Sequence, residues 1–271
     1  MSAFEHSPPN LSTDALAALA TRLFGITGSV KMLASERDQN ARIDTGDARY
    51  VLKIVNAGEP FDQIEMQDAV LAHLAAAGMR GIPVPVQTVD GAAHGVETID
   101  GFDCIVRMVG FLEGDMLSAT PRTPAQMRAL GAFIGDLSKG MAGFGHAGAH
   151  RGDFPWALDS VRDLRGYARD IADADRRNMV EALFARYDAK VLPVLPRLRA
   201  SVLHQDANDN NVIVDPANPE RIIGVIDFGD MCFGRTINEL AITLAYALLD
   251  APDLYSASRA VIEGYVSRFA I

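Results

Sequence analysis

The chain has 271 residues, which is enough for one large domain or two lobes with a substantial core. It carries 25 Lys and Arg against 35 Asp and Glu, and the formal net charge of -10 argues against a nucleic acid or an anionic membrane as partner, because both bind basic surfaces. The start, "MSAFEHSPPN", lacks the basic flank and apolar core of a signal peptide, and the longest apolar run, "LAITLAYALL" at 240–249, is too short to span a bilayer. We therefore expect a cytoplasmic protein in which Cys104 and Cys232 are buried thiols.

The first hundred residues predict a small, mainly antiparallel sheet. A helix is expected from Ser12 to Phe24, because Ser12 can cap its start and Gly25 can close its end. Strand patterning follows in "SVKML", "ARIDT" and "RYVLKIV", and apolar residues at helical spacing then predict a long helix over 61–77. Three more strands are expected in "IPVPVQTVDG", "GVETI" and "FDCIVRM".

The rest of the chain is mainly helical in composition. After a linker-like stretch, "GFLEGDML", helices are expected over 124–144, near 159–171 and over about 174–192, and two more finish the chain. Short strands interrupt them around 201–215 and in "RIIGVIDFGD". The pattern predicts an α+β protein with a β-rich lobe, 1–110, that contains one long helix, and a mainly helical lobe, 111–271.

A dense group of polar residues lies in "SVLHQDANDNNVIVD", between two apolar stretches that read as strands. Buried polar groups without partners are costly, so these residues need partners of their own. One explanation is an Asx-rich loop, in which Asn and Asp side chains bond to their own backbone. The other is a binding site for a ligand that supplies those partners.

The spacing in this stretch favours a metal and nucleotide site. Hairpin-like strands would bring Asn211 close to Asp227 of "IDFGD", and two such oxygen ligands suit Mg²⁺, which otherwise takes phosphate oxygens and water. Asp206, which is not needed as a ligand, would be left to accept a proton from a substrate hydroxyl. Protein kinases use the same combination, with a catalytic-loop Asp and Asn followed by a metal-binding Asp-Phe-Gly.

Four stretches carry a resemblance to a known family. They are "SERDQNARI" at 35–43, "VRMVGFLEGDML" at 106–117, "LHQDANDNNVIV" at 203–214 and "GVIDFGDMCFGRTINELAI" at 224–242. The sequence resembles the aminoglycoside phosphotransferase and choline kinase superfamily of small-molecule kinases, and most of all hydroxylysine kinases and the related kinase domains that bacteria fuse to aminotransferases. The resemblance implies a protein-kinase-like, two-lobed fold, and it leaves open that the chain is part of a longer protein fused to an aminotransferase.

The resemblance also implies roles for individual residues. Asp206 matches the catalytic base, Asn211 and Asp227 match the Mg²⁺ ligands, and Lys53 matches the strand lysine that holds the nucleotide phosphates. Lys53 can also be read as a surface lysine that ends an apolar run. The linker whose backbone edge pairs with the purine matches Met108, Val109, Gly110 and Phe111.

Two positions depart from the family pattern. Gln205 stands in the catalytic motif where the family usually has glycine. The helix residue that should pair with Lys53 is either Glu65 or Gln67, and only one of them can reach it, because residues two apart on a helix do not share a face.

Several further residues have two readings. In "ASERDQNA", Ser35 and Arg37 are candidate phosphate contacts or else solvated turn residues, since the stretch has no glycine. Trp156 lies in a stretch that resembles the family's segment near the acceptor site, or it packs in the core. Arg235 would bind an acceptor carboxylate, or form a structural ion pair with Glu239.

The remaining site residues complete an expected function. Asp209 and Asp230 would bind an ammonium group, and His204 would orient the catalytic loop by hydrogen bonds. The expected activity is transfer of the γ-phosphoryl of a purine nucleotide, with Mg²⁺ as cofactor, to the hydroxyl of an amino alcohol, hydroxylysine being favoured. GTP in place of ATP is implied only by the resemblance. The alternatives are homoserine, ethanolamine, choline or an aminoglycoside as acceptor, or an inactive nucleotide-binding module.

Overall fold

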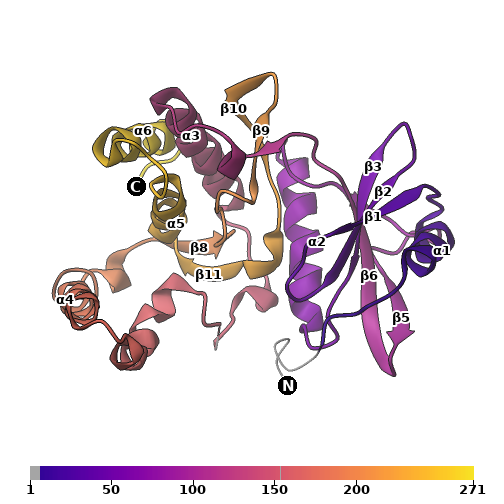
Figure 1. Ribbon diagram of the computed structural model, residues 1–271, viewed down its shortest axis with the longest axis horizontal. Helices are drawn as coiled ribbons and strands as arrows, with labels where there is room; N and C mark the ends of the chain where they lie inside the picture. The colour runs from indigo at the N-terminus through magenta and orange to yellow at the C-terminus, as the bar shows by residue number, and fades with distance from the viewer. Residues whose placement is uncertain (1–6, 153) are drawn as a thin grey trace. The chain divides into compact units, whose positions relative to one another are not determined.

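The computed structural model describes residues 7–152 and 154–271 (Figure 1). The chain divides into two compact units. The first unit is Met1–Gly114 with Gly224–Ile226, and the second is Asp115–Ile223 with Asp227–Ile271. The units therefore do not coincide with the continuous ranges 1–110 and 111–271, because a short segment late in the sequence returns to the first unit.

The first unit is built on a six-stranded sheet with the order β1-β2-β3-β6-β4, and β5 also pairs with β6. The strands are β1 Ser29–Leu33, β2 Gln39–Asp44, β3 Arg49–Ile54, β4 Pro85–Val86, β5 Gly95–Ile99 and β6 Phe102–Gly110. All of these pairings are antiparallel, as predicted. The strand expected over 82–91 shrinks to β4, because Pro83 and Pro85 have no N–H to donate to a ladder.

One face of this sheet packs against helix α1 (Thr13–Phe24), which has the predicted ends. The Ser12 side chain accepts a hydrogen bond from the N–H of Ala15, and Gly25 closes the helix in the left-handed region at φ 67°. Residues directly opposite each other on antiparallel strands point to the same face, so the register Ala41–Leu52–Met108 lays one continuous apolar row across the sheet. The core on this face contains Leu16, Leu19, Ala20, Phe24, Ala41, Ile43, Leu52, Ile54, Val106 and Met108.

The long helix α2 (Phe61–Ala76) lies on the opposite side of the sheet from α1 (Figure 1). It follows β3, as expected, and it buries Ile64, Val70 and Leu74. The first unit thus has three layers, with the sheet between α1 and α2.

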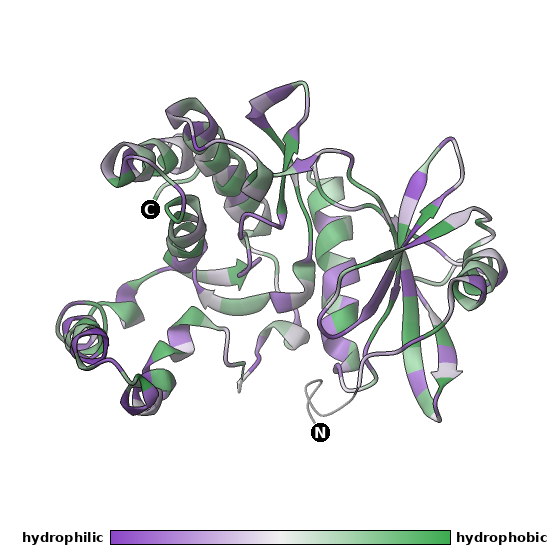
Figure 2. Cartoon of the chain, viewed as in Figure 1, coloured by the Kyte–Doolittle hydropathy of each residue, from purple (hydrophilic) through white to green (hydrophobic). Residues whose placement is uncertain are grey.

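The second unit centres on the helices α3 (Pro124–Met141), α5 (Ile237–Ala247) and α6 (Leu254–Val266). Hydrophobic residues cover much of α3 and α5 in Figure 2. Glycines let α3 and α6 approach closely: a methyl group on Gly131 would lie 1.9 Å from the Val261 carbonyl oxygen, and one on Gly264 would lie 2.0 Å from that of Arg128. The helix α4 (Ala174–Lys190) buries no residue, and the segment expected near 159–171 is a 3₁₀ helix, η3 (Leu158–Asp170).

Two small sheets lie mainly in this unit, with the orders β10-β9-β7 and β11-β8. The strands are β7 Asp115–Met116, β8 Ala200–Leu203, β9 Val212–Asp215, β10 Asn218–Val225 and β11 Cys232–Arg235. The short 3₁₀ turns are η1 Leu117–Ala119, η2 Ala147–Ala149, η4 Leu195–Arg197 and η5 Phe228–Asp230. A sheet-based first unit and a mainly helical second unit confirm the expected α+β class.

Two other expectations can be compared with the described residues. Cys104 and Cys232 are both buried free thiols. Among the residues that the structure describes, no helix combines the length and the apolar character that crossing a membrane requires.

Candidate active site

The polar stretch forms the loop between β8 and β9, and two strand pairings position it. β8 pairs antiparallel with β11, with Leu203 opposite Cys232, which fixes the point where the loop leaves the sheet. A two-residue turn joins β9 to its neighbour β10, so Asn211, just before β9, and Asp227, just after β10, lie at the same end of a hairpin. The strand-loop-strand context predicted from the sequence is therefore present.

Asp206 is held by amide groups within this loop. The Asn211 side-chain N–H₂ donates to the Asp206 carboxylate at 2.7 Å and to its carbonyl oxygen at 2.9 Å. The Asn208 side-chain N–H₂ donates to the other carboxylate oxygen at 2.8 Å. A hydrogen bond to each oxygen thus fixes the orientation of the carboxylate. A group that orients a reacting hydroxyl needs such a fixed orientation.

Negative charge converges at this end of the hairpin. The pKa of the Asp206 carboxyl is raised to about 6, chiefly by burial, and the hydrogen bond from Asn208 opposes the shift while Asp230 and Asp227 add to it. Asp227 has a left-handed backbone, φ 62°, and its carboxylate accepts the N–H of Gly229 at 3.3 Å. Carboxylates that repel one another in this way form a favourable place for a cation.

The residues present fit a divalent ion that is held by few protein oxygens and mainly by phosphate oxygens and water. The amide of Asn211 donates to Asp206, and within the described ranges its Oδ1 accepts no hydrogen bond, which leaves that oxygen for a metal. In the same described residues, no group of three or more His, Cys, Asp or Glu side chains is placed to hold a metal ion. Mg²⁺ bound through one or two protein oxygens together with phosphate oxygens and water matches this donor set.

His204 is completely buried under the loop. Its Nδ1 accepts the backbone N–H of Asp206 at 3.3 Å, and its ring meets Phe228 edge-on, with 4.6 Å between ring centroids. The Phe of Asp-Phe-Gly therefore contacts the His of the catalytic motif. This geometry fits a residue that orients the loop.

Glu239 of α5 is a further part of the site, and its role was missed in the sequence. It is buried, and its Oε2 accepts the backbone N–H of His204 at 2.7 Å and that of Gln205 at 3.5 Å. Burial raises the pKa of its carboxyl to about 7, and the two backbone hydrogen bonds oppose that shift. The available signal was one acidic residue at the start of a mainly apolar helix.

Arg235 does not form the ion pair with Glu239 that the sequence suggested as one of two readings. Its Nε lies 3.9 Å from the carboxylate of Asp159, which also accepts the Arg235 backbone N–H at 3.2 Å. The side-chain amide of Asn238 donates to the same carboxylate at 2.7 Å. The ion-pair reading was wrong about the partner, because Glu239 is turned into the core toward the loop.

Gln205 has a backbone φ of 68°, in the left-handed region where glycine is unstrained. This conformation explains why glycine is usual at the position. The Gln205 amide donates to the Trp156 carbonyl oxygen at 3.1 Å, which ties the catalytic loop to the Trp156 segment. Trp156 is 62% exposed as a residue, so the reading of Trp156 as a core residue was wrong.

Asp209 is already paired with a cation. Its carboxylate accepts a hydrogen bond from Arg122 at 2.8 Å, and both side chains are buried. Arg122 also donates to the carbonyl oxygen of Leu117. This geometry favours Asp209 as an anchor of the loop.

The predicted nucleotide residues of the first unit lie on β3, on α2, on β6 with the residue that follows it, and in the loop between β1 and β2. Lys53 is half-buried and stands directly opposite Arg107. Gln67 is buried and accepts a hydrogen bond from Arg107, whereas Glu65 is exposed. Asn56 ties down the loop that contains Ser35 and Arg37, because it donates to the Arg37 carbonyl oxygen at 3.1 Å.

The linker residues are held in place by contacts within the protein. Met108 and Val109 are buried strand residues. The N–H of Gly110 donates to Val84 at 2.8 Å, and that of Phe111 donates to Arg49 at 2.9 Å. A purine edge would pair with these two N–H groups only after those contacts open, so pairing at the linker stays a prediction.

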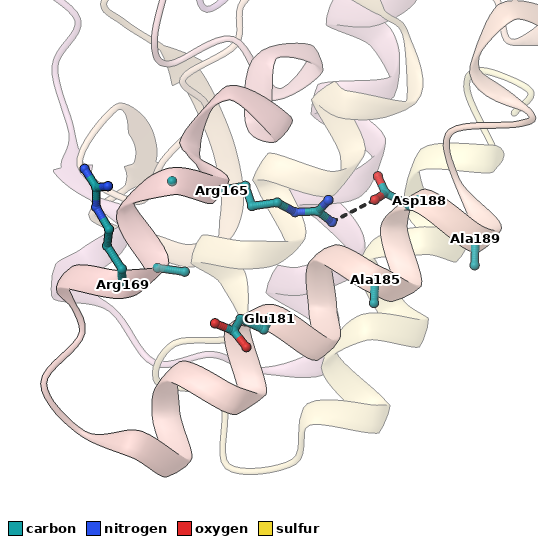
Figure 3. Close-up of a pocket in the computed structure, with 8 residues that line it drawn as sticks. Arg165, Arg169, Glu181, Ala185, Asp188 and Ala189 are labelled. Atoms are coloured by element: carbon teal, nitrogen blue, oxygen red, sulfur yellow. Dashed lines mark hydrogen bonds and ion pairs between the residues drawn. The ribbon is translucent and has the colours of Figure 1, made fainter.

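A separate cavity of about 700 Å³ lies between η3 and α4 (Figure 3). An ion pair of 2.7 Å joins Arg165 of η3 to Asp188 of α4 at this cavity, and Arg169 and Glu181 also contribute to its lining. None of the predicted site residues lines this cavity. We assign it no part in the chemistry of the loop.

Comparison with known proteins identifies the family of the chain. The sequence model of the phosphotransferase enzyme family matches residues 29–266. Hydroxylysine kinase of Xenopus laevis is 30% identical to the chain over 293 aligned positions, which cover 98% of the chain and 78% of that protein.

Solved structures of kinases share the fold. A microcompartment-associated aminopropanol kinase matches 96% of the chain and 82% of its own length, at 20% identity and a TM-score of 0.74. An amicoumacin kinase, solved with AMP-PNP and Ca²⁺, matches 96% of the chain and 79% of its own length, at 15% identity and a TM-score of 0.71. These likenesses confirm the protein-kinase-like fold. The match of the family model over residues 29–266 establishes that the chain belongs to the phosphotransferase enzyme family.

Proposed function

We propose that the chain is a kinase that transfers the γ-phosphoryl of a purine nucleotide to the hydroxyl of a small amino alcohol, with hydroxylysine as the preferred acceptor. The observation that carries the proposal is the loop after β8, in which Asn211 fixes Asp206 by two hydrogen bonds at one end of the hairpin that also bears Asp227. The hydroxylysine kinase relative, aligned over 98% of the chain, supports the choice of acceptor.

The loop divides the chemistry between its residues. Asp206 would accept a hydrogen bond from the acceptor hydroxyl and direct its oxygen at the γ-phosphorus, and it would take the proton as the new bond forms. Asn211 and Asp227 would hold Mg²⁺, which when bound neutralises phosphate charge. His204 and Glu239 hold the backbone of the loop, so that little reorganisation is needed when the substrates bind.

In the first unit, Lys53 would hold the nucleotide phosphates, and the backbone of 108–111 would lie along the purine. The choice between ATP and GTP depends on that linker, whose N–H groups are partly occupied by Val84 and Arg49. Ser35 and Arg37, in the loop between β1 and β2, are the candidates for contacts that cover the phosphates.

Two groups of the second unit suit an acceptor that carries an amine and a carboxylate. Asp230 adds negative charge beside Asp206, as its effect on the Asp206 pKa shows. Arg235 is oriented by Asp159 and retains about 30% side-chain exposure, which leaves part of its guanidinium for a carboxylate. The exposed Trp156, tied to Gln205, would cover the aliphatic part of the acceptor.

The test is a panel of acceptors with Mg²⁺ and either ATP or GTP. The panel contains hydroxylysine, homoserine, ethanolamine, choline and an aminoglycoside, and release of the nucleoside diphosphate is followed for each. We expect kcat/KM for hydroxylysine to exceed that of the other acceptors by about tenfold or more, as contacts to a matched polar group allow. The Asp206→Asn variant is the control that assigns turnover to this loop.

The outcomes separate the parts of the proposal. Preference for another acceptor would refute hydroxylysine and keep the kinase. Nucleotide binding without transfer to any acceptor would support the inactive binding module in its place.

A further inference from the structure

A buried ionic cluster ties α2 to the sheet. Arg107 of β6 donates through its two terminal nitrogens to the Gln67 side-chain oxygen and to the Asp68 carboxylate, both on α2. His94 lies 3.8 Å from the same carboxylate, and its ring meets Phe61, at the start of α2, with 5.3 Å between ring centroids. The helix is therefore held at its beginning and at its middle.

The cluster is too deeply buried to be an ordinary surface ion pair. The Arg107 side chain is 4% exposed and that of Asp68 is 14% exposed. Burial raises the pKa of the Asp68 carboxyl, and the charge of Arg107 opposes that shift. A buried carboxylate of this kind persists only beside its cation, so the position of α2 depends on Arg107.

The cluster lies beside the phosphate lysine. Lys53 and Arg107 are opposite each other on adjacent antiparallel strands, so their side chains point to the same face, roughly 5 Å apart at their Cβ atoms. Two cations at that spacing repel each other unless one is neutralised, and Asp68 neutralises Arg107. Gln67, one of the two residues expected to hold Lys53, is engaged by Arg107 as well.

We propose that Arg107 is a positioning residue for nucleotide binding, which holds α2 on the sheet through Gln67 and Asp68 and so sets the place at which Lys53 meets a phosphate. This inference rests on the role of Lys53 in the proposed function. It assigns to Arg107 a strand-to-helix contact directly beside that lysine.

The test uses the full chain and a double variant, Arg107→Met with Asp68→Asn, which removes the ionic contact without leaving a buried charge unpaired. Its matched control is Arg22→Met with Glu97→Gln, since that pair, 2.5 Å apart, also joins a helix to a strand of the same sheet, α1 to β5. Nucleotide affinity is measured by calorimetry, acceptor KM by steady-state kinetics and folding by thermal unfolding.

We expect the double variant to fold and to bind nucleotide about tenfold to 100-fold more weakly, the usual cost of a misplaced binding group. Its acceptor KM should change less than about twofold, and the control should keep wild-type affinity. In the double-variant background, Lys53→Met should weaken nucleotide binding less than it does in the wild type, because both changes act on the same group.

A folded double variant with wild-type nucleotide affinity would overturn the inference. So would a loss that adds fully to that of Lys53→Met, because the two positions would then be independent. A wild-type chain that binds no purine nucleotide would instead refute the proposed function.

Discussion

The carboxylate of Glu239 on α5 accepts the backbone N–H of His204 at 2.7 Å, at the point where β8 becomes the catalytic loop. A helix near the end of the chain thereby fixes the loop on which Asp206 stands. The contact buries a carboxylate, and burial raises its pKa from the ordinary 4.5 to about 7. Such a shift has a consequence for stability that can be measured.

Glu239 should make stability depend on pH. Because its pKa is higher in the folded state than in the unfolded chain, its contribution is fully present below about pH 4.5 and is lost as the pH rises through about 7. Each unit of pKa shift corresponds to about 1.4 kcal/mol. Urea unfolding of the wild type and Glu239→Gln at pH 5 and pH 7.5 should show the wild type losing more stability between the two values. Parallel losses would mean that the carboxyl does not titrate in this range.

Asp206→Asn should separate turnover from binding. The change discards the negative charge, and we expect kcat to fall by about two to four orders of magnitude while nucleotide affinity survives. An asparagine also loses one of the two side-chain acceptors, because Asn208 and Asn211 both donate to this carboxylate. Asn208→Ala is therefore the matched control: it removes one of those hydrogen bonds, keeps the charge and should retain most of the turnover. Loss of nucleotide binding in Asp206→Asn would place this residue in the metal site.

Asp227→Asn is the variant that best tests the metal assignment. Asparagine tolerates the left-handed backbone at φ 62°, whereas alanine would be strained there, so the fold should melt close to the wild-type temperature. We expect phosphoryl transfer to fall sharply and to require far more Mg²⁺. A Mg²⁺ titration of activity at fixed nucleotide checks this, and a near-normal titration would remove Asp227 from the ligand set.

Gly131→Ala should destabilise the second unit without touching the loop. The added methyl group would lie 1.9 Å from the Val261 carbonyl oxygen, so α3 and α6 must move apart. The cost of such overpacking is about 1–3 kcal/mol. Gly145→Ala, where nothing lies within 4 Å of the added methyl, is the control and should be nearly neutral. Equal unfolding free energies for the two variants would show that the helices separate without cost.

Local signals in the sequence predicted much of the fold. Ser12 as the cap and Gly25 as the closing residue specify α1. The strand patterning of the residues that follow specifies β1–β3, again from neighbouring residues alone. The strand-loop-strand context of Asp206, Asn211 and Asp227 was equally readable, because a short hairpin leaves little choice of geometry. The proline-containing stretch 82–91 was overestimated as a strand, since apolar residues there outweighed the missing N–H groups.

The partners of the buried charged groups were decided only by the tertiary structure. Glu239 holds the backbone of His204, and Asp209 pairs with Arg122. Arg107 joins the strand β6 to the helix α2. Spacing in the sequence cannot select among distant acids and bases, because any of them could form an ion pair in water. Burial makes the selection, since a charge taken out of water is tolerated only where the packed helices and strands bring a partner to it.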